Sequence, residues 1–208
     1  MIPVTLQWKR PVDGVEKVED EAGADVFAPR SDRIEDFALH ITDLENPVAL
    51  RFINAWLELD QTMTSFLSRF GMLKQVDQPT PVKDADLLWK ELSVRLMEST
   101  DRSGVPKRKA IYINALLEDA PTKLSFDWDP DSDTERLTLH PENLFGLMAL
   151  EVALAHEAGA TTTACDYCHK LFLIGPLTGR RSHAKYCSDR CRVAAMRKRK
   201  REGSNDVN

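Results

Sequence analysis

The first 164 residues of this 208-residue chain contain no cysteine, so a disulfide framework is excluded for most of the molecule. A chain without disulfides fits a reducing compartment. Long apolar runs are also missing, since the longest, residues 144–154, is interrupted by Glu151 and is too short to span a bilayer. The first ten residues lack the charged and apolar regions of a secretion signal. These absences predict a cytoplasmic protein with no membrane partner.

The motifs of common catalytic sites are absent as well. His156 and Glu157 begin like the zinc-protease motif, but Ala160 stands where the second histidine of that motif would be. The stretch 175–179 lacks the lysine and the Ser or Thr of a phosphate-binding loop. The acidic stretch 129–133 lacks the ligand order of a calcium loop and is typical of a solvated turn. We therefore predict that the protein is not an enzyme.

What the chain does contain is a cluster of four cysteines near its end. Cys165 and Cys168 are separated by two residues, Cys187 and Cys191 by three, and eighteen residues lie between the pairs. Two pairs of thiolates at this spacing can close a tetrahedron around one Zn²⁺ and leave no position open for a substrate. The sequence predicts one structural Zn²⁺ with these four ligands. The rival ligands in the same segment are two histidines, His169 and His183.

The same segment carries an excess of positive charge. Between residues 165 and 201, eleven Lys or Arg stand against two acids, Asp166 and Asp189. Residues 165–208 sum to +7, so residues 1–164 carry −12 of the net −5. An acidic body with a basic end indicates that only the end meets nucleic acid.

Ser188 is a good helix N-cap, and the Ala- and Arg-rich run after it favours a helix. With 3.6 residues per turn, one basic stripe lies on one flank of this helix and a second stripe on the other flank. The loop before the helix adds further basic residues. The predicted nucleic-acid contacts are Arg180, Arg181, Lys185, Arg190, Arg192, Arg197, Arg199 and Arg201.

This segment resembles the CGNR-type zinc fingers that follow an ABATE domain in bacterial proteins. The likeness consists of a CxxC knuckle, an apolar triplet, an arginine-rich loop, an aromatic-Cys-Ser step and a cysteine that opens a basic helix. In this chain the five features lie at residues 165–168, 171–173, 179–181, 186–188 and 191–201. The chain from about Ile113 to the knuckle is also similar. The tetrad that names the family reads Cys-Arg-Val-Ala at residues 191–194, and the last cysteine pair is one residue closer than in the family. The resemblance implies a DNA-binding transcription regulator.

The body before the finger has the pattern of an α+β fold. Helices are predicted from capping residues and apolar periodicity at 47–70, 84–99, 108–119 and 141–158. Residues 111–113 also allow the start of a strand. Alternating apolar residues on both sides of the turn at 129–133 predict a β-hairpin. Val4, Leu6 and Trp8 alternate as in a short strand, whereas 12–25 has a loop-like composition and 34–42 gives no clear pattern.

Two domains follow from these patterns: a helix-rich, ABATE-like body at 1–160, with 1–33 loosely structured, and a finger at 161–208. The predicted fold class is α+β, a helix-rich body with a small β-hairpin plus a C-terminal zinc finger of knuckle and helix. The favoured function is zinc-dependent binding of duplex DNA in transcriptional regulation, with the acidic body sensing an unknown ligand or forming a homodimer. The alternative is a zinc-stapled module that binds an acidic protein partner.

Overall fold

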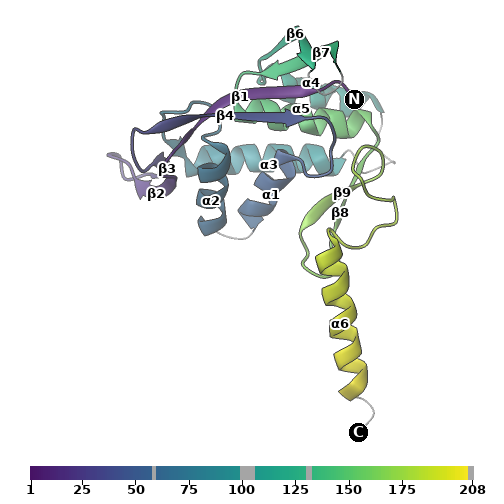
Figure 1. Ribbon diagram of the computed structural model, residues 1–208. Coiled ribbons are helices and arrows are strands. Elements are labelled where there is room, and N and C mark those ends of the chain that lie inside the picture. Colours follow the sequence, from purple (N-terminus) through teal and green to yellow (C-terminus); the bar gives the residue numbers. More distant parts are fainter. Residues whose placement is uncertain (58–59, 99–105, 130–132, 206–208) are drawn as a thin grey trace.

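The computed structural model of the protein describes residues 1–57, 60–98, 106–129 and 133–205. Its described part is mixed α+β, with six helices and three sheets (Figure 1). The helices are α1 (Val48–Leu57), α2 (Asp60–Phe70), α3 (Val82–Glu98), α4 (Pro106–Glu118), α5 (Leu144–Glu157) and α6 (Asp189–Asn205). The strands are β1 (Val4–Pro11), β2 (Val15–Glu19), β3 (Asp25–Pro29), β4 (Ile34–Ile41), β5 (Thr80–Pro81), β6 (Thr122–Asp129), β7 (Thr134–Pro141), β8 (Thr161–Ala164) and β9 (Leu171–Ile174).

The N-terminal residues are more ordered than the sequence indicated. Residues 1–33 were expected to be loosely structured, and this expectation is wrong because they form β1, β2 and β3. Gly14 and Gly23 adopt positive φ angles of 81° and 77° in the connections that flank β2. The glycines and acidic residues in 12–25 give this stretch a composition typical of turns, so the sequence did not indicate these strands. The strand β4 pairs with β1 from Ile41 against Val4 to Ile34 against Pro11, a long-range pairing that local sequence did not indicate.

The predicted hairpin is present as β6 and β7, which pair antiparallel. It is not an isolated hairpin, because β7 also meets β1 in parallel where Val4 pairs with Leu139. The result is a four-stranded sheet of order β4-β1-β7-β6, beside a second sheet of order β2-β3-β5. Of the acidic turn predicted at 129–133, residues 130–132 lie outside the described residues.

The helix predicted at 47–70 is two helices, α1 and α2, and residues 58–59 between them lie outside the described range. The rings of Phe52 and Phe66 lie 5.4 Å apart. Along one straight helix, fourteen residues would separate them by about 21 Å. The two segments therefore pack against each other, which apolar periodicity alone cannot distinguish from one long helix.

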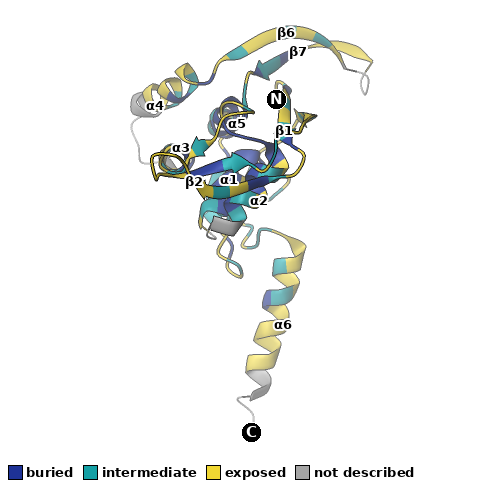
Figure 2. Cartoon of the chain, turned by 90° about the vertical axis from the view of Figure 1, so that its left-hand side faces the viewer, coloured by how far each residue is buried: buried dark blue, intermediate teal, exposed yellow. Residues whose placement is uncertain are grey.

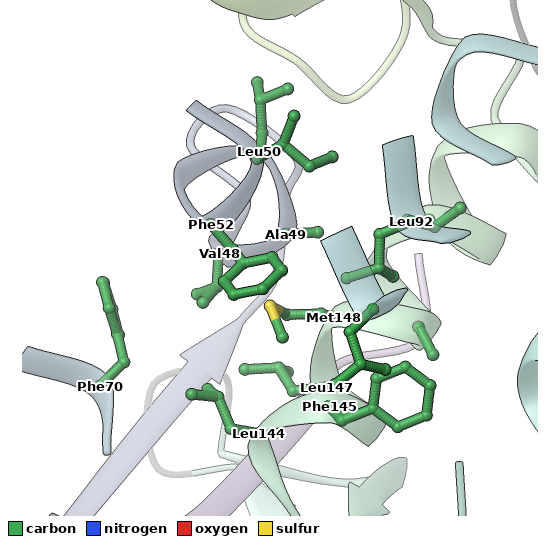
Figure 3. Close-up of a cluster of buried hydrophobic side chains, with 14 of the residues drawn as sticks. Val48, Ala49, Leu50, Phe52, Phe70, Leu92, Leu144, Phe145, Leu147 and Met148 are labelled. Carbon is green, nitrogen blue, oxygen red and sulfur yellow. The ribbon is translucent and has the colours of Figure 1, made fainter. Parts of the chain in front are cut away.

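The core is centred on α5, which is apolar nearly all round. Figure 3 shows Phe52 of α1 and Leu92 of α3 pointing toward Met148 of α5, and all three side chains are buried. Asn143 caps the helix, since its side-chain oxygen accepts the Gly146 N–H at 2.7 Å. The central buried helix that the sequence predicted at 141–158 is thus confirmed. Within the described residues, no helix is both long and apolar enough to cross a membrane.

Candidate metal centre and basic helix

The first cysteine pair lies in the turn of the hairpin formed by β8 and β9. Thr161 pairs with Ile174 at one end of this hairpin and Ala164 with Leu171 at the other. In the turn, the Cys165 N–H donates to the Lys170 carbonyl and the His169 N–H donates to the Cys165 carbonyl, each at 2.9 Å. His169 has a φ of 61°, a left-handed conformation that side-chain-bearing residues rarely adopt. The chain is thereby folded into a tight knuckle.

The second cysteine pair lies at the start of α6 and faces the knuckle. All four sulfur atoms lie within 4.8 Å of one another. The Cys187 Sγ atom is 3.6 Å from that of Cys168 and 3.5 Å from that of Cys191. A tetrahedron of four sulfurs around an ion at 2.3 Å has edges of about 3.8 Å, close to these values. The four cysteines can therefore hold a metal ion, and in the described chain no other group of three or more such ligands is gathered.

The two rival histidines are not part of this cluster. His169 and His183 are exposed, and neither belongs to the group of ligand atoms that lie close together. His169 instead contributes its left-handed backbone conformation to the turn of the knuckle. The candidate ligand set within the described residues is therefore sulfur alone.

The thiols differ in how readily they ionise. Burial opposes ionisation of Cys165, but backbone hydrogen bonds from Cys168, Cys187 and Tyr167 lower its pKa to about 7. Burial raises the pKa of Cys168 and of Cys187. A bound divalent cation stabilises thiolates, so its presence would offset this effect of burial on the thiols.

The helix α6 begins where the sequence predicted, with Ser188 as its cap. The Ser188 hydroxyl accepts the Cys191 N–H at 3.3 Å, and its carbonyl accepts the Arg192 N–H at 3.1 Å. Asp189 in the first turn places a negative charge at the positive end of the helix dipole. From this end α6 projects away from the body as a single exposed helix (Figures 1 and 2).

The hairpin that carries the knuckle is attached to the body through α1. The Asn54 side-chain amide donates to the Leu171 carbonyl at 2.9 Å and accepts the Leu171 N–H at 2.8 Å. The Asn54 side chain therefore pairs with the N–H and C=O groups of Leu171 on β9, as the backbone of a neighbouring strand would. Phe172 and Leu173 of the same strand are 3% and 0% exposed and belong to the main hydrophobic core. The finger and body share one core rather than meeting through a linker.

The loop after β9 makes a second attachment to the body. The Leu44 N–H donates to the Leu177 carbonyl at 2.7 Å. The Arg180 guanidinium donates to the Glu45 carbonyl at 2.6 Å and to the Cys187 carbonyl at 3.1 Å. It also lies over the Phe172 ring, 5.8 Å from the centroid. Arg180, predicted as a nucleic-acid contact, is engaged in holding the loop against the body.

The other predicted contacts differ in how far they are engaged. Arg192 pairs with Asp189 at 3.0 Å, and Arg199 donates to the Tyr186 hydroxyl at 3.4 Å. A further group is exposed and has no ion pair or side-chain hydrogen bond within the described part of the chain. This group is Arg181, Lys185, Arg190, Arg197 and Arg201.

Sequence reasoning missed the residues that join finger to body. Asn54 is a polar residue inside the apolar repeat of α1, and that interruption was a usable signal. Glu151 interrupts the apolar run of α5 in the same way. It is 1% exposed and accepts the N–H groups of Val48 and Ala49 at 2.9 and 2.7 Å, which caps α1 from a distance. Burial raises the pKa of Glu151 to about 7, against these two hydrogen bonds and the nearby Arg51 charge, which lower it.

The body also contains a cleft with a volume of about 470 Å³ beside α3. Its lining includes the apolar residues Leu73, Leu88 and Phe145 and the acidic residues Asp84 and Asp119. This cleft is one of several described hollows of similar volume, and it has room for a small ligand of the kind expected for the body.

Comparison with known proteins adds no relative: the chain matches no family model, no curated protein and no solved structure. The resemblance to the CGNR-type finger therefore rests on the residues described above.

Proposed function

We propose that the four cysteines hold one structural Zn²⁺ and that α6 binds the phosphate backbone of duplex DNA. Zinc is the metal for which four thiolates in a closed tetrahedron are a common structural site. Such an ion fixes the knuckle to the first turn of α6. It supplies folding energy and leaves no coordination position for a substrate, which fits a non-catalytic role.

The observation that carries the DNA-binding proposal is the basic, projecting helix α6. Among its exposed residues, Arg190, Arg197 and Arg201 recur at helical spacing and form one stripe, about 16 Å long at 1.5 Å rise per residue. With four thiolates and one Zn²⁺ included, residues 165–201 carry about +7. A rigid helix of this charge is suited to DNA, because the major groove of B-DNA, about 12 Å wide, admits an α-helix.

The arrangement of side chains around α6 suits the two walls of a groove. Arg192 and Arg199 lie on the flank opposite the stripe of Arg190, Arg197 and Arg201. Val193 and Met196, which are 39% and 56% exposed, lie between the flanks. In this proposal the flanks contact phosphates and the apolar pair faces the base edges, where thymine methyl groups accept apolar contact.

The wider role that we propose is that of a cytoplasmic transcription regulator related to the CGNR-type proteins. The charge division supports it, since the acidic body is unsuited to nucleic acid and leaves binding to the finger. In this role the body senses a ligand or dimerises.

The decisive experiment is a salt titration of binding to a labelled duplex by fluorescence anisotropy, using the full chain. We expect log K to fall linearly with log salt. The double variant Arg197→Gln/Arg201→Gln should bind weaker on every duplex, with the salt slope flatter by about two. The matched control, Arg30→Gln/Lys83→Gln, removes the same charge from exposed positions of the body and should leave the slope unchanged.

Two outcomes would overturn the proposal. If the α6 double variant binds as well as the parent chain, the helix is a solvated tail. If an acidic polypeptide competes with duplex at equal charge concentration and binds more tightly, the zinc-stapled protein-interaction module is the better function.

A further inference from the structure

The strand β6 is one of the two outer strands of the four-stranded sheet, and its apolar side chains are exposed. Leu124, Phe126 and Trp128 alternate along one face of the strand and are 65%, 72% and 59% exposed. Leu137 of β7, which pairs with Phe126, continues the row and is 38% exposed. In Figure 2 the β6–β7 hairpin extends beyond the body as an arm. A long outer strand with large apolar residues is a site for pairing with another strand.

The backbone of β6 presents its free hydrogen-bonding groups at these same residues. The Leu139 N–H donates to the Pro3 carbonyl of the β1 side, so Leu139 directs its polar groups away from β6. Leu139 pairs with Leu124, and in an antiparallel ladder both members of such a pair point away from each other. Leu124, Phe126 and Trp128 therefore direct their N–H and C=O groups to the open edge. None of these groups has a hydrogen bond within the described residues.

Only some registers between β6 and β6 of a second copy satisfy the free N–H and C=O groups of the two strands. The outward residues are even-numbered, so an antiparallel pairing must place even opposite even. When the pairing is centred on Ser125, Leu124 lies opposite Phe126 of the second copy, and Lys123 lies opposite Asp127 of the second copy. The pairs on either side of the centre are then matched in kind, Leu124 with Phe126 as apolar with apolar and Lys123 with Asp127 as cation with anion. Lys123 and Asp127 are on the polar face with side chains 76% and 40% exposed, and within the chain they pair with Glu142 at 3.0 Å and His140 at 2.6 Å, so the contact with the second copy adds to these pairs.

We propose that β6 pairs with β6 of a second copy of this chain, antiparallel and centred on Ser125. The contact joins two four-stranded sheets into one of eight strands and is isologous, since each residue meets its counterpart about a two-fold axis. The Lys123–Asp127 pairs occur twice and fix the register, and the Leu124–Phe126 pairs contribute cross-strand apolar contact. Because a single strand edge is a small interface, we expect the dimer dissociation constant to lie in the micromolar range.

The register can be tested with a cysteine at the centre of the pairing. Ser125 and its counterpart form a non-hydrogen-bonded pair with Cα atoms about 4.5 Å apart, within the range of a disulfide. We expect Ser125→Cys to form an intermolecular disulfide on mild oxidation of the zinc-loaded chain, identified by mass spectrometry of the crosslinked peptide. The control, Lys123→Cys, lies about 14 Å from its own counterpart and should not crosslink. The parent chain gives the background from the four finger cysteines.

The dimer itself is tested by sedimentation equilibrium of the full chain. We expect Lys123→Glu, which sets like charges opposite each other at two places, to raise the dimer dissociation constant about tenfold. Lys83→Glu makes the same charge change at an exposed site on α3 and should have no effect. If the parent chain still sediments as a monomer at a concentration of about 100 μM, the proposal is overturned. A dimer that crosslinks equally at both cysteine positions, or at neither, would overturn the register.

Discussion

The helices α5 and α6 are similar in length but are held in opposite ways. Eleven of the fourteen residues of α5 are buried, and its flanks are covered by α1 and α3. In α6, within the residues whose side chains are described, only Ala195 is buried (Figure 2). The first helix is fixed along its whole length by apolar contact. The second is fixed at one end, where Cys191 joins the sulfur cluster and Ser188 caps the first turn.

The difference teaches what each helix can do. A helix buried on all sides is stabilised by packing and presents no surface to a partner. A helix fixed only at its N-terminal end keeps its charged faces in water, where they can meet another molecule. Burial stabilises α5, whereas in the proposed zinc site metal binding orders α6.

Removal of the metal should produce the largest effect, and it should fall on the finger and spare α5. A structural zinc contributes about 10–16 kcal/mol of apparent binding free energy, so its chelation should unfold the finger. We expect limited proteolysis to begin within residues 175–205 and to spare 144–157, as peptide mapping would show. Metal analysis of the fresh protein should give one zinc per chain.

Single substitutions separate this effect from damage to the body. Cys191→Ser should abolish zinc binding, whereas His183→Ala, at an exposed site outside the cluster, should leave it intact. If chelation melted α5 together with α6, the two helices would form one cooperative unit and the contrast between them would fail.

Shortening a buried side chain of α5 should lower the free energy of unfolding more than shortening an exposed side chain of α6. Leu147 is fully buried, so Leu147→Ala should lower the free energy of unfolding by about 2–5 kcal/mol. Met196 is 56% exposed, and Met196→Ala should change it by less than about 0.5 kcal/mol. Urea denaturation of both variants measures the two values. Equal losses would show that α6 packs against something in solution.

The charged residue inside α5 should make the stability of the body depend on pH. Burial raises the pKa of Glu151 from 4.5 to about 7, so the folded chain binds the proton more tightly than the unfolded chain does. Protonated Glu151 therefore makes a contribution to the free energy of unfolding that is complete below about pH 4.5. This contribution of about 3 kcal/mol is lost as the pH rises through about 7. Denaturation across this range should show the loss in the parent chain and not in Glu151→Gln. The exposed Glu157 on the same helix provides the control, and Glu157→Gln should keep the parent profile.

The smallest effect is expected at the joint between body and finger. Asn54→Ala removes two hydrogen bonds to the Leu171 backbone and should lower the free energy of unfolding by about 1–3 kcal/mol. Hydrogen exchange should locate the change at β9, with α5 unaffected. Asn114→Ala, at an exposed position on α4, should have no effect on either measurement. Unchanged exchange at β9 in the Asn54 variant would show that buried Phe172 and Leu173 hold the hairpin without it.

The features predictable from sequence were those encoded within one short segment. The cysteine spacing indicated a four-sulfur cluster, because ligands three or four residues apart converge in a tight turn or on one face of a helix. Apolar periodicity located α3, α4, α5 and the β6–β7 hairpin, since each element displays its own repeat along the chain. Ser188 likewise indicated the start of α6 from local capping chemistry alone.

What only the tertiary structure decided are contacts between residues far apart in sequence. Asn54 and Leu171 are 117 residues apart, Glu151 and Val48 are 103 apart, and Arg180 and Glu45 are 135 apart. No repeat or motif announces such a pair, because each partner looks like an ordinary polar residue in its own segment. For the same reason β4 was not recognised, and Arg180 was grouped with the free basic residues although it holds its loop to the body. Local pattern determined most of the helices, the β6–β7 hairpin and the candidate metal ligands, whereas the choice of partner for a buried polar group depends on which surfaces folding brings together.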